Sequence, residues 1–559
     1  MSEDRLIYMP LGGAGEIGMN CYVYGYGKPG QERLIVVDLG VTFPDMDTSP
    51  GVDLIMADVE WLAQNRERIE AIFITHAHED HVGALGHLWP RLKAPVYARV
   101  FTGAIAADKM TEAGQPVDAV HIVGPRPAVT QAGPFQVQFV PLSHSIPESA
   151  ALVIDTPAGR IVHSGDFKLD GTPVVGEPFD PREWLTIAKE KGRVRAMTCD
   201  STNIFSPNPG RSEATLAQPI TELVKGQKGL VVATTFASNV ARLKTLADAG
   251  RAAGRSICLL GRAMNRMVTA AKQAGVVTDF PPTLTPEDAA DVADADLMLI
   301  VTGSQGERRA AAAQLSRGKY LGHELKAGDL FLFSSKIIPG NERDVFRIWN
   351  ALSEKGVHVI DDHNGTYHVS GHANRPDLEA VHELVNPQML VPMHGEHRHL
   401  TEHAAVAAAK GLVTAIVTKG TMVSLSGDKP VVVEHVEAGR TYLDGTVLIG
   451  ALDGVVRDRI RMALNGLVLV TLIIDEEGEP LGDAWVEIMG LPETGKSGRG
   501  LADEMEHDLT DYLKAAPQKV VADDDKLDEQ VKRIVRQAAM DEIGKKPEVM
   551  VVVSRLMAE

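Results

Sequence analysis

The chain has 559 residues, too many for one hydrophobic core, so three or four domains are expected. Hydrophobic residues make up 44% and charged residues 23%, a composition typical of globular proteins and not of disordered chains. The net charge is −19, so binding to nucleic acid would require a locally basic groove.

The cysteines are scattered at positions 21, 199 and 258, which does not form a disulfide framework and predicts a reducing compartment. The first residues lack a basic segment followed by an apolar one, as a secretion signal would have. No apolar run approaches the roughly 20 residues of a membrane span. We therefore expect a cytoplasmic protein with no membrane partner.

Residues 1–210 are predicted to form short strands joined by glycine-rich turns, because β-branched residues recur between Gly, Pro and Asp. The clearest strands are expected at 33–38, 71–75, 135–142 and 151–155. Residues 211–355 change character, because apolar strands alternate there with Ala-rich, helix-like stretches. Those strands are expected at 229–235, 256–260, 297–302 and 330–334. This alternation predicts a parallel α/β domain.

Residues 356–450 return to short strands, so the α/β domain is expected to be inserted into the first one. Residues 451–465 are expected to be a linker, and residues 466–559 a small α+β domain. Its elements are predicted to be a hairpin of 467–475 and 483–489, helices near 501–515 and 525–543, and a strand at 548–554. The apolar hairpin suggests self-association, and a self-contained domain is the alternative.

A glycine motif near the start matches a dinucleotide-binding pattern, but the residues that follow the motif do not fit that pattern. Gly13, Gly15 and Gly18 spell G-x-G-x-x-G, and Asp38 lies about twenty residues further on, as in dinucleotide-binding proteins. That motif requires a helix to begin at the last glycine. Here tyrosines alternate at 22, 24 and 26, as in a strand. We expect the glycines to shape a hairpin beside the active site.

The strongest chemical signal is the sequence T-H-A-H-E-D-H at residues 75–81. His76 and His78 are two residues apart, so in extended backbone they point the same way. Asp80 and His81 follow where the chain is expected to turn into a helix. Zinc binds imidazole and carboxylate groups, and donors that face two directions suggest two metal ions.

Two metals need further ligands, and the sequence places candidates directly after predicted strands. These candidates are His144, Asp166 and His394. A single histidine is more often a structural residue than a ligand. Their shared position at strand ends favours the metal-site interpretation.

This ordered set resembles the metallo-β-lactamase fold, an αββα sandwich. Asp200 in C-D-S-T-N, His372 in H-V-S-G-H-A and His394 in P-M-H-G-E look like motifs A, B and C of the β-CASP subgroup, which carries an inserted domain and acts on nucleic acids. L-G-G-A-G-E-I-G-M-N near the start, T-G-S-Q-G-E at 302–307 and P-G-N-E at 339–342 are similar to the ribonuclease J family. The resemblance covers about residues 5–450, and the tail matches only in position and composition.

The resemblance implies a fold and a set of ligands. The fold would be a multidomain α/β and α+β protein: an αββα sandwich with an inserted β-CASP α/β domain and a small C-terminal α+β domain. One zinc ion would be held by His76, His78 and His144, the other by Asp80, His81 and His394, with Asp166 between them. Mn²⁺ or Mg²⁺ is an alternative at the second position. Asp200 and His372 would be the acid–base pair.

The resemblance also implies an activity and a substrate. The enzyme would be a zinc-dependent ribonuclease, a 5′-to-3′ exonuclease with some endonuclease activity, in RNA processing, including rRNA processing, and decay. Single-stranded RNA would enter with a 5′-monophosphate held by the segment His368, Val369, Ser370, Gly371 and His372. A plain glycine turn is the alternative for this segment. A homodimer or homotetramer is expected, and an RNA-degradation complex is a further partner.

Phe236 and several basic residues each have two possible roles. Phe236, in T-T-F-A-S-N, either stacks on an RNA base or belongs to the core. Basic residues such as Arg262, Arg266, Lys319 and Lys336 either neutralise the RNA backbone or are solvated surface. Alternative functions are a β-CASP DNA nuclease, a hydrolase of a small thioester, lactone or lactam, and a non-catalytic RNA-binding scaffold.

Overall fold

The computed structural model describes residues 4–556. The chain forms two compact units: residues up to Thr42 with Met56–Arg440, and Phe43–Ile55 with Thr441 onward. Within residues 4–556, none of the helices combines the length and the apolar composition that a membrane span requires.

The first unit contains a sandwich of two sheets. One sheet has the order β24 (Val431–His435), β23 (Thr421–Ser424), β1 (Arg5–Gly12), β3 (Cys21–Gly27), β4 (Arg33–Val37), β7 (Ile69–Phe73), β8 (Val96–Ala98) and β9 (Val120–Ile122). The other has the order β10 (Thr130–Ala132), β11 (Phe135–Pro141), β12 (Ala150–Thr156), β13 (Gly159–His163), β14 (Ala196–Asp200), β20 (Met389–Met393) and β22 (Val413–Thr414).

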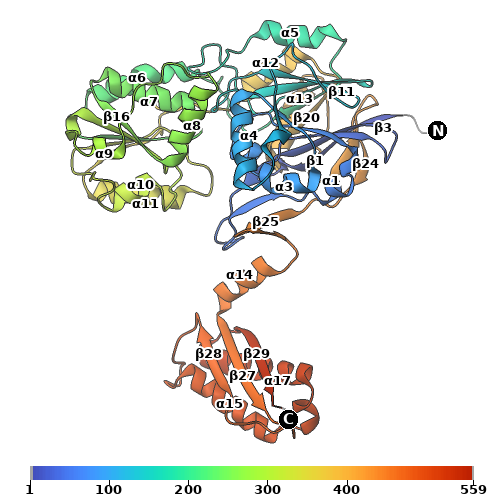
Figure 1. Cartoon of the computed structure of the whole chain (residues 1–559), viewed down its shortest axis with the longest axis vertical. Helices are drawn as coiled ribbons and strands as arrows, with labels where there is room; N and C mark the ends of the chain where they lie inside the picture. Colours follow the sequence, from blue (N-terminus) through green and yellow to red (C-terminus); the bar gives the residue numbers. More distant parts are fainter. Residues whose placement is uncertain (1–3, 557–559) are drawn as a thin grey trace. The chain divides into compact units, whose positions relative to one another are not determined.

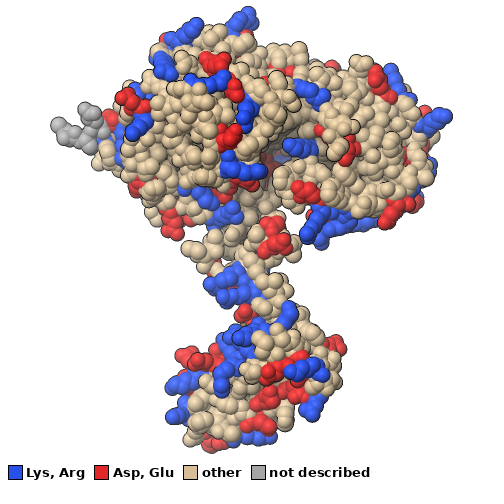
Figure 2. Space-filling model, turned by 180° about the vertical axis from the view of Figure 1, so that it is seen from behind, with Lys and Arg blue, Asp and Glu red and all other residues tan. Residues whose placement is uncertain are grey.

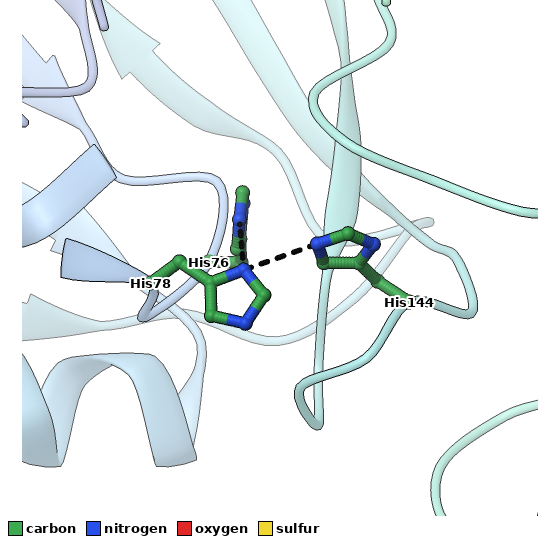
Figure 3. Close-up of side chains that lie close together, drawn as sticks. All are labelled: His76, His78 and His144. Carbon is green, nitrogen blue, oxygen red and sulfur yellow. Dashed lines mark hydrogen bonds between the residues drawn. The ribbon is translucent and has the colours of Figure 1, made fainter. Parts of the chain in front are cut away.

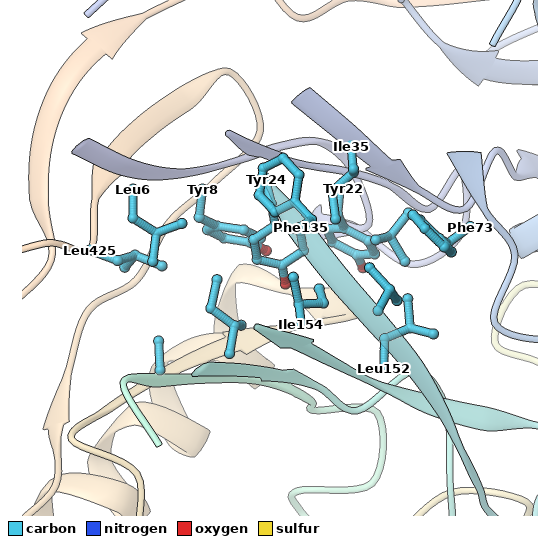
Figure 4. Packing of buried hydrophobic residues seen from close by; sticks show 14 of the residues in the cluster. Leu6, Tyr8, Tyr22, Tyr24, Ile35, Phe73, Phe135, Leu152, Ile154 and Leu425 are labelled. Carbon is cyan, nitrogen blue, oxygen red and sulfur yellow. The ribbon is translucent and has the colours of Figure 1, made fainter. Parts of the chain in front are cut away.

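The two sheets enclose the main core. Alternate residues of each strand point between the sheets, so Tyr8, Tyr22 and Tyr24 pack over Leu152 and Ile154 of the facing sheet (Figure 4). The intervening residues of the second sheet are also buried, against helices on its outer face. Burial on both faces explains the nearly continuous apolar runs of these strands.

Helices cover the outer face of each sheet (Figure 1). Those beside the first sheet are α1 (Glu60–Gln64), α3 (Leu85–Leu92) and α4 (Val100–Glu112). Those packed on the second sheet are α5 (Pro181–Glu190), α12 (Arg375–Val385) and α13 (His397–Ala409). The layers are therefore αββα, as expected.

The inserted domain has a parallel sheet of its own, in the order β16 (Ser256–Leu260), β17 (Leu297–Val301), β15 (Val231–Thr234), β18 (Leu330–Phe333) and β19 (His358–Ile360). Helices α6 (Ala217–Lys225), α7 (Val240–Ala252) and α8 (Arg262–Gln273) lie on one face, and α10 (Ala311–Arg317) and α11 (Glu342–Glu354) on the other (Figure 1). A short helix, α9 (Pro286–Ala289), precedes β17. Strand β19 lies beyond residue 355, the expected end of this domain.

The inserted domain leaves and rejoins the sandwich at neighbouring points. Strand β14, before it, pairs in parallel with β20, after it, so Asp200 lies opposite Met393. The guanidinium of Arg211 on the outgoing segment donates to the carbonyl of His368 on the returning segment, at 2.7 Å. In addition, Arg266 of α8 pairs with Asp108 of α4 at 3.0 Å. This arginine is therefore engaged within the protein and does not serve as a free cation for RNA.

The second unit contains the C-terminal domain. Its sheet has the order β28 (Trp485–Met489), β27 (Leu467–Ile474) and β29 (Glu548–Arg555), and β27 pairs in parallel with β29. Helices α15 (Leu501–Ala515), α16 (Gln518–Val521) and α17 (Asp524–Ile543) bury one face of the sheet. A β-hairpin of β25 (Arg440–Asp444) and β26 (Val447–Gly450) precedes this domain.

Two features of this region bear on the expectations for the linker and for self-association. Helix α14 (Val455–Asn465) occupies most of the segment expected to be a linker. Strand β27 is paired on both edges, so its backbone is not free to pair across subunits. What the sheet does leave uncovered is an apolar face, on which Trp485, Met489 and Met550 are 63%, 72% and 57% exposed.

Candidate metal centre and catalytic site

The histidine-rich loop follows β7 and changes direction at His78. His78 is the N-cap of the short helix α2 (Glu79–Val82), so His76 and His78 lie on extended backbone and His81 lies in the helix. His144, from the segment after β11, completes a group with the first two histidines (Figure 3). His78 Nδ1 lies 3.2 Å from His76 Nε2 and 3.0 Å from His144 Nε2. Three ring nitrogens thus face one point.

A second group lies beside the first. Its members are Asp80, His81, Asp166 and His394. Asp166 Oδ2 lies 3.1 Å from His81 Nε2 and 3.3 Å from His394 Nε2. Asp80 Oδ2 is 3.2 Å from His394 Nε2. Asp80 and His81 lie in α2, Asp166 follows β13 and His394 follows β20, and all except Asp80 are buried.

Asp166 stands between the two groups. Its Oδ2 is also 3.9 Å from His76 Nε2 and 4.0 Å from His144 Nε2. Its Oδ1 is buried and has no hydrogen-bond partner among the described residues. Such an atom is costly unless a cation or another donor satisfies it. The two groups together provide five histidines and two aspartates. These N and O donors fit a pair of metal ions.

The charge states of the two groups differ. Burial, with His81 nearby, lowers the pKa of His76 well below its usual value, and burial lowers that of His78 to about 4. Neutral imidazoles present the lone pairs that a metal needs. Burial alone would also lower the pKa of His394, but Asp166 and the other carboxylates raise it to about 9. The second group is thus the more negative environment and attracts positive charge.

The candidate ligand histidines other than His78 are each oriented by a hydrogen bond at the other ring nitrogen. His81 Nδ1 lies 2.8 Å from Asp38 Oδ2. Thr75 Oγ1 donates to the same carboxylate, so it accepts from His76 Nδ1 at 3.0 Å. Asp38 itself has φ of +63°, a strained conformation held by its surroundings. Sequence reasoning missed Asp38 and assigned it only to the rejected cofactor motif.

His394 is oriented in the same manner by a second missed residue, Thr202. The Thr202 hydroxyl donates to Asp200 Oδ1 at 2.7 Å and lies 2.7 Å from His394 Nδ1, which therefore carries the proton. His394 has φ of +51°. Immediately after it, β21 (Gly395–Glu396) pairs with β2 (Ala14–Gly15) of the glycine-rich segment. No helix follows those glycines, and the segment lies beside the site as expected.

Asp200 and His372 form a close pair above the metal ligands. His372 Nδ1 lies 2.8 Å from Asp200 Oδ2. The ring of His372 packs against that of His144, with centroids 4.8 Å apart. Burial would lower the pKa of His372, but Asp200 outweighs it and the pKa is raised. The raised pKa favours the imidazolium form, in which Nε2 also carries a proton beside the ligand groups.

The segment His368–His372 is held by contacts that leave donors free. Ser370 Oγ accepts from Asn203 Nδ2 at 2.8 Å and from the His372 N–H at 3.2 Å, so its own hydrogen is available to donate. His368 Nδ1 accepts from Arg242 Nη1 at 3.1 Å, so Nε2 carries the hydrogen. Val369 contributes only its backbone to the surface of this segment, because its side chain is buried.

Phe236 lies apart from these groups. It lines a separate cavity in the inserted domain, together with Arg262 and Tyr320. Its side chain is half-buried, which fits neither a core residue nor a contact with the metal ligands.

The described residues contain two further groups of metal-ligating types. One, Asp166, Asp200, His372 and His394, belongs to the site above, and the other is Cys199, His382 and His403. All three are buried, and the Nε2 atoms of the two histidines are 3.0 Å apart. Ser201 Oγ lies 2.9 Å from His403 Nδ1. A structural zinc site takes four ligands. We interpret this group as a hydrogen-bonded pair of neutral histidines.

Comparison with sequence families gives matches along the whole chain. Residues 14–199 match "Metallo-beta-lactamase superfamily", and residues 228–352 match "Ribonuclease J, beta-CASP domain". Residues 362–417 match "Zn-dependent metallo-hydrolase RNA specificity domain", and residues 454–556 match "Ribonuclease J C-terminal domain". The metal-ligand groups and the His368–His372 segment lie within these matches.

Full-length relatives agree. The chain is 39% identical to ribonuclease J of Sinorhizobium meliloti over 557 residues, covering 99% of this chain and 98% of that protein. It is 35% identical to ribonuclease J of Corynebacterium glutamicum, covering 90% and 70%, and 30% identical to that of Helicobacter pylori, covering 98% and 79%. A crystal structure of a protein of unknown function from Enterococcus faecalis shares the fold, with a TM-score of 0.51, 17% identity, and coverage of 75% of this chain and 100% of that one.

Proposed function

This chain belongs to the ribonuclease J family of metal-dependent ribonucleases with 5′-to-3′ exonuclease and endonuclease activity, and we propose that the residues above form its RNA-cleaving centre. The observation that carries this assignment is the convergence of seven ligand side chains with Asp166 between the two groups. His76, His78 and His144 would hold one zinc ion, and Asp80, His81 and His394 would hold the other. Asp166, which lies between the two groups, would be a ligand as well.

The bound zinc pair supplies positive charge to the phosphoryl oxygens and lowers the pKa of nearby water. Because the second group includes the carboxylates of Asp80 and Asp166, Mn²⁺ or Mg²⁺ suits it better than the three-histidine group. Asp38, Thr75 and Thr202 fix the tautomers of the ligand histidines.

His372 is the general acid of the reaction. Asp200 keeps it protonated and orients it, so Nε2 can donate to the 3′-oxygen that leaves from phosphorus. The product then carries a 5′-phosphate. His372 is 21% exposed at its side chain, which leaves it accessible to a substrate.

The segment His368–His372 holds the 5′-monophosphate of the RNA. Ser370 offers a hydroxyl hydrogen and His368 an Nε2–H, and both are fixed by bonds to the protein on their other side. Fixed donors bind a dianionic phosphate without the cost of ordering them first. Figure 2 shows Lys and Arg side chains, with Asp and Glu among them, around a hollow in the first unit. The basic side chains can contact RNA phosphates there, on a chain of net charge −19.

The uncovered face of the C-terminal sheet supports self-association. Trp485, Met489 and Met550 expose an apolar surface of the kind that packs against a second copy in a homodimer or homotetramer. We place the enzyme in the cytoplasm, where its buried, unpaired cysteines stay reduced. Trp485→Asp should lower the mass of the particle in solution, and an unchanged mass would remove this face from the interface.

The function is tested with one RNA sequence carrying a 5′-monophosphate, a 5′-triphosphate or a 5′-hydroxyl, and with the matched DNA. We expect the 5′-monophosphorylated RNA to be degraded fastest and a chelator to abolish all cleavage. His372→Ala should lower turnover while the zinc content stays unchanged. Equal cleavage of the matched DNA would make the enzyme a general nuclease, and chelator-resistant cleavage would remove the metal centre from the mechanism.

A further inference from the structure

The inserted domain contains a cavity of about 660 Å³ at the carboxyl ends of β15, β16 and β17. Its lining includes Thr235, Phe236, Arg262, Asn265, Arg309 and Tyr320. In parallel α/β sheets, ligands bind at this edge. No residue of the segment His368–His372 and none of the described metal-ligand groups lines it.

Thr235 gives this cavity an unsatisfied polar atom. The residue is 2% exposed, and its Oγ1 has no hydrogen-bond partner among residues 4–556. A buried hydroxyl without a partner is unfavourable, so native proteins seldom keep one unless water, an ion or a ligand satisfies it. Thr235 therefore marks a position where a bound group accepts or donates a hydrogen bond.

The cavity is also positively charged. Helix α8 begins at Arg262 with Gly261 as its N-cap, and no side chain caps it, so the first N–H groups of a 12-residue helix remain available. No ion pair in the described part of the chain involves the guanidinium of Arg262 or Arg309, whereas Arg266, one turn further on, is paired. The acid in the lining, Glu307, is held by the N–H of Gln305.

Aromatic rings supply the remaining part of a nucleotide site. Phe236 and Tyr320 are half-buried and both line the cavity. Nucleic-acid bases stack on such rings without a sequence requirement. Asn265 adds an amide, although its Nδ2 already donates to the carbonyls of Leu259 and Gly261.

We propose that this cavity is a nucleotide-binding site separate from the cleavage centre. The phosphate lies at the start of α8 between Arg262 and Arg309, the Thr235 hydroxyl bonds to it, and the base packs against Phe236 and Tyr320. A nucleotide reaches the cavity from one of two sources: a free nucleoside monophosphate, or a nucleotide within an RNA strand. The RNA source rests on the proposed function, and the free-nucleotide source does not.

The test uses the full-length protein in two arms. In one arm it is photolabelled with 8-azidoadenosine 5′-monophosphate, and in the other with RNA oligonucleotides that carry one 4-thiouridine at successive positions. Labelled peptides are then sequenced. We expect label on the peptide containing Phe236 or Tyr320 in at least one arm, and the arm identifies the source.

Variants decide whether the label reports the proposed contacts. Arg262→Ala and Thr235→Val should each lower labelling at the cavity about tenfold, as expected for loss of a charged or buried hydrogen bond. The matched control is Arg308→Ala, because Arg308 is exposed and does not line the cavity. Absence of cavity label in both arms, or equal label in wild type and Arg262→Ala, would overturn the site.

RNA cleavage by the same preparations keeps the two proposals apart. Cleavage without cavity label overturns the nucleotide site and leaves the ribonuclease assignment standing. If the free nucleotide labels the cavity and the same preparation cleaves no RNA, the nucleotide site stands and the proposed RNA-cleaving centre is overturned.

Discussion

The carbonyl oxygen of Gly371 lies 2.5 Å from Nδ1 of His144. One hydrogen bond therefore links the loop that carries His372 to a ligand of the three-histidine group. It fixes the tautomer of His144, and it places His372 relative to the three-histidine group. The approach is so close that a Cβ on residue 371 would lie 2.7 Å from Ser145 Oγ and 2.9 Å from His144 Nδ1.

Gly371→Ala should therefore lower the rate of RNA cleavage about 100-fold, because the loop and His144 must separate by a distance that catalytic geometry does not tolerate. Initial rates on 5′-monophosphorylated RNA measure this effect. The control is Gly171→Ala, since nothing lies within 4 Å of a Cβ there. A wild-type rate in Gly371→Ala would show that the contact does not position the catalytic groups.

Asp38→Asn should weaken zinc binding about 10- to 100-fold, as loss of a histidine's orienting carboxylate does in other zinc sites. The amide is a poorer acceptor for His81 Nδ1–H, and it also disturbs the bond from Thr75. Competition against a chelator measures the affinity. Asp180→Asn is a suitable comparison, because Asp180 caps α5 and pairs with Arg182, and among the described residues it has no hydrogen bond or ion pair with the candidate metal ligands. Equal affinity in wild type and Asp38→Asn would show that Asp38 is dispensable for the metal.

Arg242→Met should cost about 3–5 kcal/mol of stability, because it leaves Glu213 buried without its partner. Arg242 also bonds to Ser334 and to His368, so the preference for a 5′-monophosphate should weaken with it. Denaturant-induced unfolding measures the loss of stability. Cleavage of RNAs with a 5′-monophosphate, a 5′-triphosphate or a 5′-hydroxyl measures the change in preference. Adding Glu213→Gln should recover part of the stability but none of the preference. Full stability in Arg242→Met alone would contradict the buried ion pair.

The pair of His382 and His403 should make the protein less stable in mild acid. Burial lowers the pKa of His382 to about 4, from an ordinary value of 6.5. Between these pH values the unfolded chain binds a proton that the folded chain does not, so stability falls as the pH falls from about 6.5 toward 4. At pH 5 the loss from His382 is roughly 2 kcal/mol, and above pH 7.5 it is close to zero.

His382→Gln removes this titration and keeps a polar contact with His403. The difference in unfolding free energy between pH 7.5 and pH 5 should therefore be roughly 2 kcal/mol smaller in the variant than in wild type. Denaturant titrations at the two pH values measure it. Parallel losses in both proteins would show that His382 does not titrate in this range.

The sequence revealed those parts of the site that are local. His76, His78, Asp80 and His81 share one short segment, so spacing alone pointed to metal binding. Asp38 and Thr202 were missed, because they reach their histidines only through strand pairing: β4 brings Val37 opposite Phe73, and β14 brings Asp200 opposite Met393. Register between distant strands leaves no mark in a single sequence.

In the C-terminal domain, too, local elements could be predicted from the sequence and features that depend on packing could not. Its strands and the two long helices were predicted within a residue or two, for example 525–543 against Asp524–Ile543, and the short helix α16 was not predicted. Helix α14 was missed although Gly454 and Gly466 flank it and Arg, Met and Ala favour helix. The uncovered sheet face was not foreseen either, since which face of a three-stranded sheet the helices take depends on their packing.

The hydrogen bond from Arg211 to the carbonyl of His368 joins the chain that leaves the sandwich to the chain that returns to it. It lies at the segment that we propose holds the 5′-phosphate. A change in the position of the inserted domain would therefore also shift the proposed phosphate donors, whereas the candidate metal ligands belong to the sandwich. On that proposal, the orientation of the inserted domain and the recognition of the RNA end would depend on each other.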